Sequence, residues 1–341
     1  MNGDFSRDTF DRRRQFTRVL MQQGRVLLDA DWNEQTSILL HYLQTLAADL
    51  IGPAGGPIAN LGFGIKPVLT GGPPPRLSDL TIGPGRYYVD GILCELDATT
   101  KYRQQPDWVG HEFNEPVRLP LLVFLDVWER HLIHLEEPRI REVALGGPDT
   151  ATRARVMRQV GIFELPENTP AADLECLKFD QSAAWMKLKD DQQPLNRGRL
   201  SANAKDEPAD STNPCIVSPE ARFRGEENHL YRVEIHKGGP AGTATFKWSR
   251  ENGSVVFAVE SIRGKIVTLE SLGRDARLGL EVGDWIEIID TESDSGSDRE
   301  PPHLQQVEQV DLIDLTITLG GTPIVDPAKV LYLRRWDHRA G

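Results

Sequence analysis

The sequence predicts an α+β protein that is mainly β, with an N-terminal helical arm followed by β-rich domains that include a small C-terminal β-barrel. An apolar stripe at three- and four-residue spacing lies in the first 58 residues, which is the pattern of an amphipathic helix. Short runs of alternating apolar and polar side chains follow, and they are densest in the C-terminal third. No period of roughly 20 to 50 residues repeats along the chain, which excludes a solenoid.

The helical arm is predicted to hold two helices. A short one covers residues 11–23, and a longer one starts at Trp32 and ends before the helix-stopping pair at residues 52–53 (Gly-Pro). Asp31 stands where an N-cap belongs, and Glu34 follows three residues later, which is a capping-box arrangement. The apolar stripe of the longer helix consists of Trp32, Leu39, Tyr42, Leu43, Leu46 and Leu50.

The start of the longer helix also has the ligand spacing of a calcium loop, with oxygen-bearing side chains at Asp29, Asp31 and Asn33. An EF-hand loop requires Gly at its sixth position and a bidentate Glu at its twelfth. Counted from Asp29, these positions hold Glu34 and Leu40, so both requirements fail. The pattern therefore favours the helix cap over a metal site.

Arginines are concentrated just before the longer helix. In a helix over residues 11–23, they lie largely opposite to the apolar side chains of that segment. Both a solvated face and a docking face for an acidic partner fit this pattern, and solvation is the favoured interpretation. The candidate interface residues in this segment are Arg12, Arg13, Arg14 and Arg18.

Connectors rich in Gly and Pro divide the rest of the chain. Strands are predicted within residues 86–96 and 120–135 and from Arg155 onward. The Ser, Asn, Asp and Pro content of residues 180–214 predicts a linker or long loop. The predicted units are a helical docking arm (1–58), a β-rich domain (59–179), that linker (180–214), a β-hairpin domain (215–262) and a small β-barrel (263–341).

The hairpin unit is predicted to turn at residues 252–253, because Asn-Gly favours a type I′ hairpin turn. Strand alternation places Lys247 and Ser249 on one face of the preceding strand. The opposite face carries the candidate interface residues Phe246, Trp248 and Arg250. We expect that face to meet either the neighbouring barrel or another subunit, with Glu251 or Glu226 as the partner of Arg250.

Composition limits the class of protein. Hydrophobic residues are 39% and charged residues 26% of the chain, which is typical of a soluble globular protein, and the net charge of −12 argues against binding to nucleic acid. The widely spaced Cys94, Cys176 and Cys215 exclude a cysteine-rich zinc module and argue against a disulfide framework. The charged N-terminus lacks the apolar core of a secretion signal, and no apolar run approaches the roughly 20 residues of a membrane span. We therefore expect synthesis in a reducing cytoplasm and no membrane insertion.

No catalytic, cofactor-binding or metal-binding residue is predicted. His131 and His134 are three residues apart, and on a strand they would face opposite sides. In the loop at 290–298, acidic residues alternate as in a calcium site, but the closing position holds Pro301, so a solvated acidic tip is favoured and calcium binding stays open. Residues 222–239 carry side chains found in catalytic sites, yet their alternation fits an edge strand equally well.

Longer motifs carry more information than any of these clusters. They are the stretch from "SRDTFDRRRQF" to "LLDADWNEQ", the stretch "HLYRVEIHKGGPAGTATFKWSRENGSVV", and "LEVGDWIEIID" followed by "LRRWD". Together they resemble a bacterial family encoded beside phage-tail-like contractile injection systems. The "YYVDG" to "EEP" region is also similar to proteins at the baseplate end of contractile phage tails.

The resemblance implies a structural subunit at or near the baseplate, and it carries no catalytic residues to transfer. The implied partners are other baseplate or spike subunits and further copies of the chain, for instance in a collar or cage around the spike. The implied location is a contractile particle assembled after synthesis in the cytoplasm, with or without release from the cell. Two alternatives stay open: a tail-fibre-like adhesin or fibre adaptor that binds a cell surface, and a glycan hydrolase carried by the particle.

Overall fold

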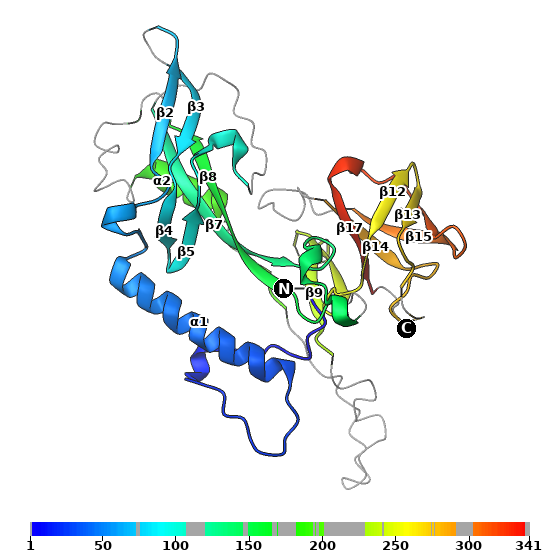
Figure 1. Ribbon diagram of the computed structural model, residues 1–341. Coiled ribbons are helices and arrows are strands. Elements are labelled where there is room, and N and C mark those ends of the chain that lie inside the picture. Colours follow the sequence, from blue (N-terminus) through cyan, green and yellow to red (C-terminus); the bar gives the residue numbers. More distant parts are fainter. Residues whose placement is uncertain are drawn as a thin grey trace.

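The computed structural model describes residues 2–72, 76–106, 120–145, 149–165, 182–193, 229–240, 242–273, 277–290 and 303–337, together with residues 169, 195, 198–200 and 275. In the described residues the N-terminal half contains several small sheets, and the C-terminal half contains a curled seven-stranded sheet and a separate two-stranded sheet (Figure 1). A long helix, α1 (Asp29–Ile51), lies beside the N-terminal half. The fold is α+β and mainly β with an N-terminal helix, as predicted.

The ends of α1 agree only in part with the sequence pattern. Its N-cap is Leu28, which makes no side-chain capping bond, and Asp31 lies inside the first turn. The predicted N-cap role of Asp31 is therefore wrong, although a carboxylate in the first turn still interacts favourably with the helix dipole. At the other end Gly52 stops the helix as predicted, with a φ of 93° and its N–H donating to the carbonyl of Ala48 at 2.8 Å.

The helix predicted over residues 11–23 is not formed. This stretch contains a single 3-10 turn, Arg12–Arg14, after which Gln15 takes a left-handed φ of 55° that interrupts a helical backbone. Farther along, the N–H of Val19 donates to Oε1 of Gln35 on α1 at 2.8 Å. The segment bonds to α1 in place of forming its own helix.

The described part of the N-terminal half contains three small antiparallel sheets. One has the order β1 (Ala54–Gly55), β4 (Gly85–Val89), β5 (Ile92–Leu96), and a second the order β2 (Ile65–Thr70), β3 (Arg76–Ile82), β6 (Thr100–Lys101). The third pairs β7 (Leu121–Leu132) with β8 (Arg153–Glu164) along their whole length. The strands predicted in this part of the chain are thus confirmed. The core is formed by Leu77, Leu80, Ile82, Leu96, Tyr102 and Val160.

A second helix, α2 (Ala183–Gln192), lies where the sequence predicted a linker or loop. Ser182 is its N-cap, and the Ser182 hydroxyl accepts a hydrogen bond from the N–H of Trp185 at 3.1 Å. Leu188 is buried. The loop prediction is wrong for this stretch, and residues 201–214 of the predicted linker lie outside the described residues.

Seven antiparallel strands form the C-terminal sheet, in the order β11-β17-β14-β15-β16-β13-β12. Their bounds are β11 (Val256–Phe257), β12 (Val259–Arg263), β13 (Ile266–Leu269), β14 (Trp285–Asp290), β15 (Leu304–Asp311), β16 (Thr316–Leu319) and β17 (Val330–Trp336). The β-rich character predicted for the C-terminal third is confirmed. The core comprises Val255, Phe257, Val267, Leu269, Leu280, Ile286, Ile288, Val307, Ile317, Leu319 and Leu333.

The C-terminal sheet curls, because its two edge strands are neighbours in the sequence. Only Ala258 separates β11 from β12. In the described residues no ladder joins these two edges, so the predicted small closed barrel is not shown. The sheet begins at Val256, inside the stretch that the sequence assigned to the hairpin unit.

A separate two-stranded sheet pairs β9 (Arg232–Lys237) with β10 (Thr245–Ser249). The predicted turn after β10 is present, since Asn252 and Gly253 have φ values of 50° and 67°. The predicted hairpin across it is wrong, because β10 pairs with β9 whereas β11 pairs with β17. The turn therefore carries the chain from one sheet to the other.

Candidate interaction surfaces

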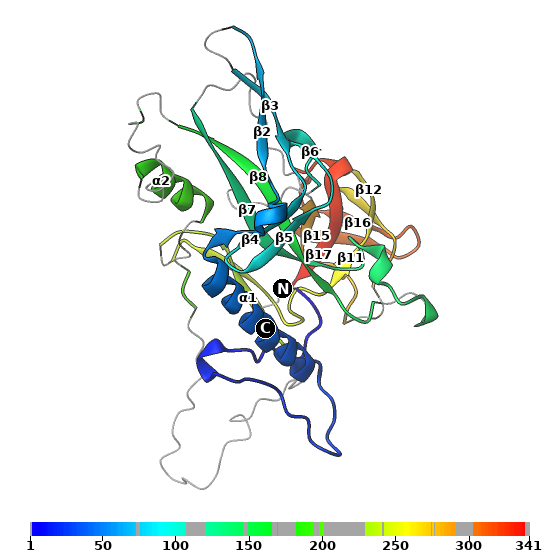
Figure 2. The ribbon, with the colours of Figure 1, turned by 60° about the vertical axis from the view of Figure 1, so that its left-hand side comes forward.

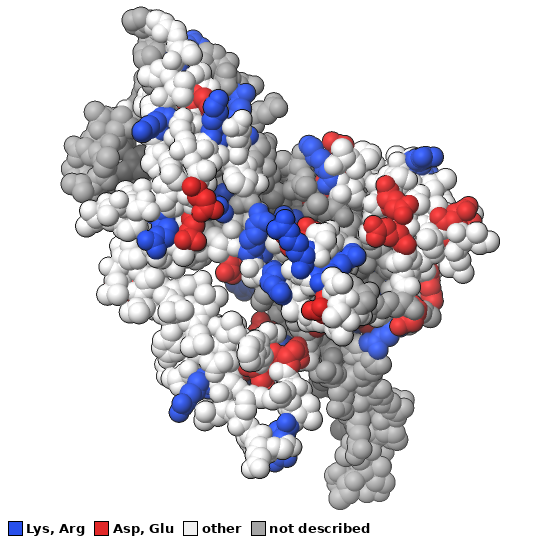
Figure 3. Space-filling model, in the orientation of Figure 1, with Lys and Arg blue, Asp and Glu red and all other residues white. Residues whose placement is uncertain are grey.

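The apolar stripe of α1 faces solvent. Trp32 and Leu50 are each 78% exposed and Leu43 is 64% exposed, while Leu39, Tyr42 and Leu46 are exposed as well. Figure 3 shows few charged side chains over α1 on the face in view. Single exposed leucines are ordinary on protein surfaces, but a continuous stripe of this length is typical of a protein–protein contact surface.

The other side of α1 holds the helix to the rest of the chain. Ala30 and Ile38 are 1% exposed, and the C-terminal part of α1 contacts β1 and β4 (Figures 1 and 2). Gly91 in the turn between β4 and β5 lies against the backbone of Gln44. A Cβ on Gly91 would stand 2.0 Å from the carbonyl oxygen of Gln44, so only glycine allows this approach.

Polar contacts tie the N-terminal segment to the start of α1. The N–H and Oγ of Ser6 donate to the carboxylate of Asp29 at 2.9 and 2.5 Å, and Oγ1 of Thr9 donates to Glu34 at 2.6 Å. Partial burial alone would raise the pKa of Asp29, but the hydrogen bonds from Ser6 outweigh it and the pKa is lowered. Glu34, predicted to complete a capping box, instead accepts the bond from Thr9.

The same segment reaches both halves of the molecule. Nδ2 of Asn252 donates to the carbonyl of Gly3 at 3.1 Å, and the ring of Phe5 lies edge-on to His131 of β7 at 6.1 Å between centroids. The segment beyond them is exposed and carries the predicted interface residues Arg12, Arg13, Arg14 and Arg18. Their exposure fits both a solvated face and a docking face, and the binding of an acidic partner stays a prediction.

The β9–β10 sheet exposes its apolar face. Phe246 is 67% exposed, and its cross-strand neighbour Ile235 is 52% exposed. Beside them Trp248 stacks on Tyr231 with ring centroids 6.3 Å apart, and the guanidinium of Arg250 lies 5.8 Å from the Trp248 ring. The predicted common face of Phe246, Trp248 and Arg250 is thus present, and it points to solvent.

The inner face of the same sheet carries charge. Nζ of Lys247 donates to Glu287 of β14 at 2.5 Å, lies 3.4 Å from Glu234 of β9 and stands 4.3 Å from the ring centroid of Trp336. Glu287, which is 1% exposed, also accepts from Nε1 of Trp336 at 2.9 Å. Burial would raise the pKa of Glu234, but the positive charges of Arg232 and Lys247 outweigh it and the pKa is lowered. An ionic cluster therefore fastens the β9–β10 sheet to the C-terminal sheet.

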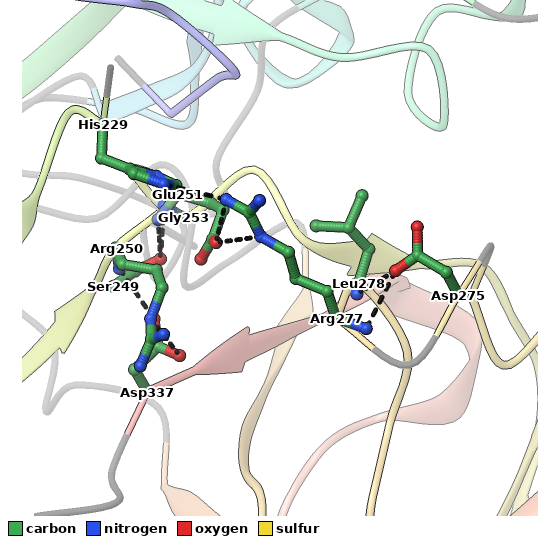
Figure 4. Close-up of polar contacts among 9 residues, drawn as sticks. All are labelled: His229, Ser249, Arg250, Glu251, Gly253, Asp275, Arg277, Leu278 and Asp337. Carbon is green, nitrogen blue, oxygen red and sulfur yellow. Dashed lines mark hydrogen bonds and ion pairs between the residues drawn. The ribbon is translucent and has the colours of Figure 1, made fainter. Parts of the chain in front are cut away.

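The turn after β10 is held by a second set of polar contacts (Figure 4). The Ser249 hydroxyl accepts bonds from the N–H groups of Glu251 and Gly253 at 3.3 and 3.0 Å. The N–H of Arg250 donates to Asp337 at 2.7 Å, and the Arg250 guanidinium lies 3.6 Å from the same carboxylate. The predicted pairing of Arg250 with Glu251 is therefore wrong.

Of the two glutamates predicted to pair with Arg250, one binds another arginine and the other is not described. Glu251 binds Arg277 at 3.3 Å, so it is already engaged in the turn (Figure 4). Glu226 lies outside the described residues. Lys247 is the functional charge that the sequence patterns did not identify, and its signal was Glu287, the single carboxylate inside the apolar run "WIEII" at residues 285–289.

The remaining candidate sites give no further chemistry in the residues that the structure describes. Nδ1 of His134 lies 3.1 Å from Asp149, whereas His131 packs on Phe5. No group of three or more His, Cys, Asp or Glu within the described ranges could hold a metal ion, and residues 291–298 of the acidic loop fall outside them. None of the described helices is long and apolar enough to cross a membrane.

Comparison with known families gives one match. The model of a family of unknown function (DUF6519) matches residues 1–183 and 192–341. Comparison with curated proteins and with solved structures gives no match.

Proposed function

The chain belongs to the DUF6519 family of unknown function, and we propose that it is a structural subunit of a phage-tail-like contractile injection system, at or near the baseplate. In this proposal the subunit acts by associating with its neighbours. The observation that carries the proposal is that two separate apolar surfaces of the chain, the α1 stripe and the outer face of the β9–β10 sheet, are exposed.

Of the two surfaces, the outer face of the β9–β10 sheet gives the stronger support for association with a neighbouring subunit. A two-stranded sheet packed on a protein normally turns its apolar side chains inward and its charges outward. Here Lys247 is 8% exposed whereas Phe246 is 67% exposed. Because burying a charge is costly unless it is paired, this reversed pattern requires the ionic cluster beneath the sheet. What the reversal provides is an apolar outer face on which a neighbouring subunit can pack.

Two distinct apolar surfaces on one chain are also what a multi-subunit assembly needs. A single surface allows a closed dimer, whereas two different surfaces allow each subunit to contact two neighbours, as in rings. The resemblance of the N-terminal and hairpin motifs to proteins encoded beside contractile injection systems supports the choice of particle. The same two surfaces would also serve a fibre adaptor, which is the alternative to be tested against.

Incorporation into the particle tests the proposal. Contractile particles are purified from the organism that encodes the chain, and the chain is sought in them by mass spectrometry and immunogold labelling. We expect the wild-type chain at the baseplate end. A variant combining Ile235→Ser with Phe246→Ser should fold, because both side chains are exposed, but should be lost from the particle.

Glu260→Ser is the control, because Glu260 is an exposed polar residue of β12 that lies outside both apolar surfaces. This control should incorporate as the wild type does. Absence of the wild-type chain from purified particles would overturn the proposal. So would normal incorporation of the Ile235→Ser, Phe246→Ser variant after the α1 stripe has also been made polar.

A further inference from the structure

Six exposed side chains of α1 have the spacing of a coiled-coil seam. Five of them belong to the apolar stripe, and Thr36 stands in place of Tyr42. Successive steps of four, three, four, three and four residues connect the six, which is the a/d pattern of a heptad repeat. All six side chains are exposed, and all but Thr36 are apolar. We call this set the α1 seam; it consists of Trp32, Thr36, Leu39, Leu43, Leu46 and Leu50.

Within the part of the chain that the structure describes, the seam lies apart from the buried side of α1. The buried residues of α1 are Ala30 and Ile38, neither of which belongs to the seam. In a helix of 3.6 residues per turn, the two lie on a different side of the cylinder from the seam. A heptad seam requires a facing helix, because each a or d side chain fills a hole formed by four residues of a partner.

We propose that the facing helix is α1 of a second copy of this chain, paired antiparallel about a two-fold axis. This inference rests on the proposed function, since it names the partner of one of its two surfaces. The seam is symmetric about His41, so an antiparallel pair sets Trp32 against Leu50 of the second copy and Leu39 against its Leu43. A two-fold contact needs such self-complementarity, in which residue i meets residue j and j meets i.

The positions beside the seam favour a second copy over a different protein. Charges at these positions usually set partner choice in coiled coils. Here the flanking positions are Asn33, Gln35, Leu40, Tyr42, Ala47 and Asp49, of which only Asp49 is charged. In the antiparallel pair Asp49 lies beside Gln35 of the second copy, so no like charges meet.

The size of the surface suits a stable pair. Seven apolar side chains in and beside the seam are between 43% and 78% exposed, and together they present on the order of 700 Å² of accessible surface. A standard interface buries about 800 Å² per partner. The accessible area of the seam and its flanking residues is thus close to the area that one partner buries in a dimer interface.

Sedimentation velocity of the purified full-length chain tests the pairing without any other particle component. The wild type should dimerise in a concentration-dependent manner. Leu43→Gln, near the centre of the seam, should weaken dimerisation by about 30-fold or more, the loss typical of a buried hot-spot residue. Thr45→Gln is the matched control, because Thr45 is exposed on the same helix outside the seam, and it should leave dimerisation unchanged.

Disulfide trapping tests the orientation. A chain with Trp32→Cys mixed with one carrying Leu50→Cys should form a cross-linked pair above the wild-type background, whereas Leu50→Cys alone should not. Self-cross-linking of Leu50→Cys would overturn the antiparallel arrangement. A wild-type chain that stays monomeric, or dimerisation that Leu43→Gln leaves intact, would overturn the pairing and assign the seam to another protein. Incorporation of such a monomer into particles would leave the proposed function standing.

Discussion

Removing the charge of Lys247 while keeping its length should destabilise the C-terminal half strongly. Lys247→Met leaves Glu287 1% exposed with Trp336 as its one remaining donor of those described above. Breaking a buried ion pair by deleting one partner typically costs about 3–5 kcal/mol, because the other charge stays buried. The contact of the ammonium with the Trp336 ring, 4.3 Å from its centroid, is lost as well, so the upper part of this range is expected.

A double variant separates the charge from the packing. Glu287→Gln keeps an acceptor for the Trp336 N–H but removes the buried negative charge. Combined with Lys247→Met, it should recover at least about 2 kcal/mol relative to Lys247→Met alone, because no unpaired charge is then left inside. The free energy of unfolding is measured by urea titration followed by tryptophan fluorescence. A loss below about 1 kcal/mol for Lys247→Met, or no recovery in the double variant, would refute the buried-pair explanation.

Three further changes test local features. Gly91→Ala should cost about 2 kcal/mol or more and expose α1 to limited proteolysis, because its Cβ would collide with the carbonyl of Gln44; unchanged proteolysis would contradict the close approach. Gly253→Val should raise the unfolding rate and lower the melting temperature, whereas Gly253→Asn should be tolerated, since Asn accepts a φ of +67° and Val does not; equal effects would show that the turn relaxes. Asp29→Ala should abolish the hydrogen-exchange protection of residues 2–10, whereas Asp31→Ala should change stability by at most about 0.5 kcal/mol. Because the pKa of Asp29 is lowered, its contribution is complete above the ordinary value of 3.8 and is lost as pH falls through the lowered pKa, so protection that persists in strong acid would count against it.

The strands were predictable because their signal is local. Alternation in "RVEIHK" and "TFKWS" depends only on neighbouring residues, and the structure has β9 and β10 there. The left-handed backbone at residues 252–253 was equally predictable, since Asn-Gly favours it. What the turn connects was not predictable from it, because the pairing of β11 with β17 joins residues almost eighty positions apart.

Whether the apolar face of each amphipathic element is buried or exposed was harder to predict. Periodicity shows that α1 has an apolar side, but not whether the same chain covers it. Likewise, alternation separates Phe246 from Lys247 without saying which is buried. That choice depends on Glu287, forty residues later, whose buried carboxylate requires a cation. The start of α1 was missed for a similar reason, since Ser6, distant in sequence, binds Asp29.

The place of β17 in the C-terminal sheet has a consequence for the order of folding. β17 is the last described strand, yet it lies between β11 and β14. During synthesis the ladders of β17 with β14 and with β11 therefore cannot form until residues 330–336 have left the ribosome. Until then both strands present unpaired edges, which are the sites at which nascent chains aggregate. The sheet should thus be completed only in a late step, when β17 joins β11 to β14, and chains shortened before Val330 should accumulate as insoluble material.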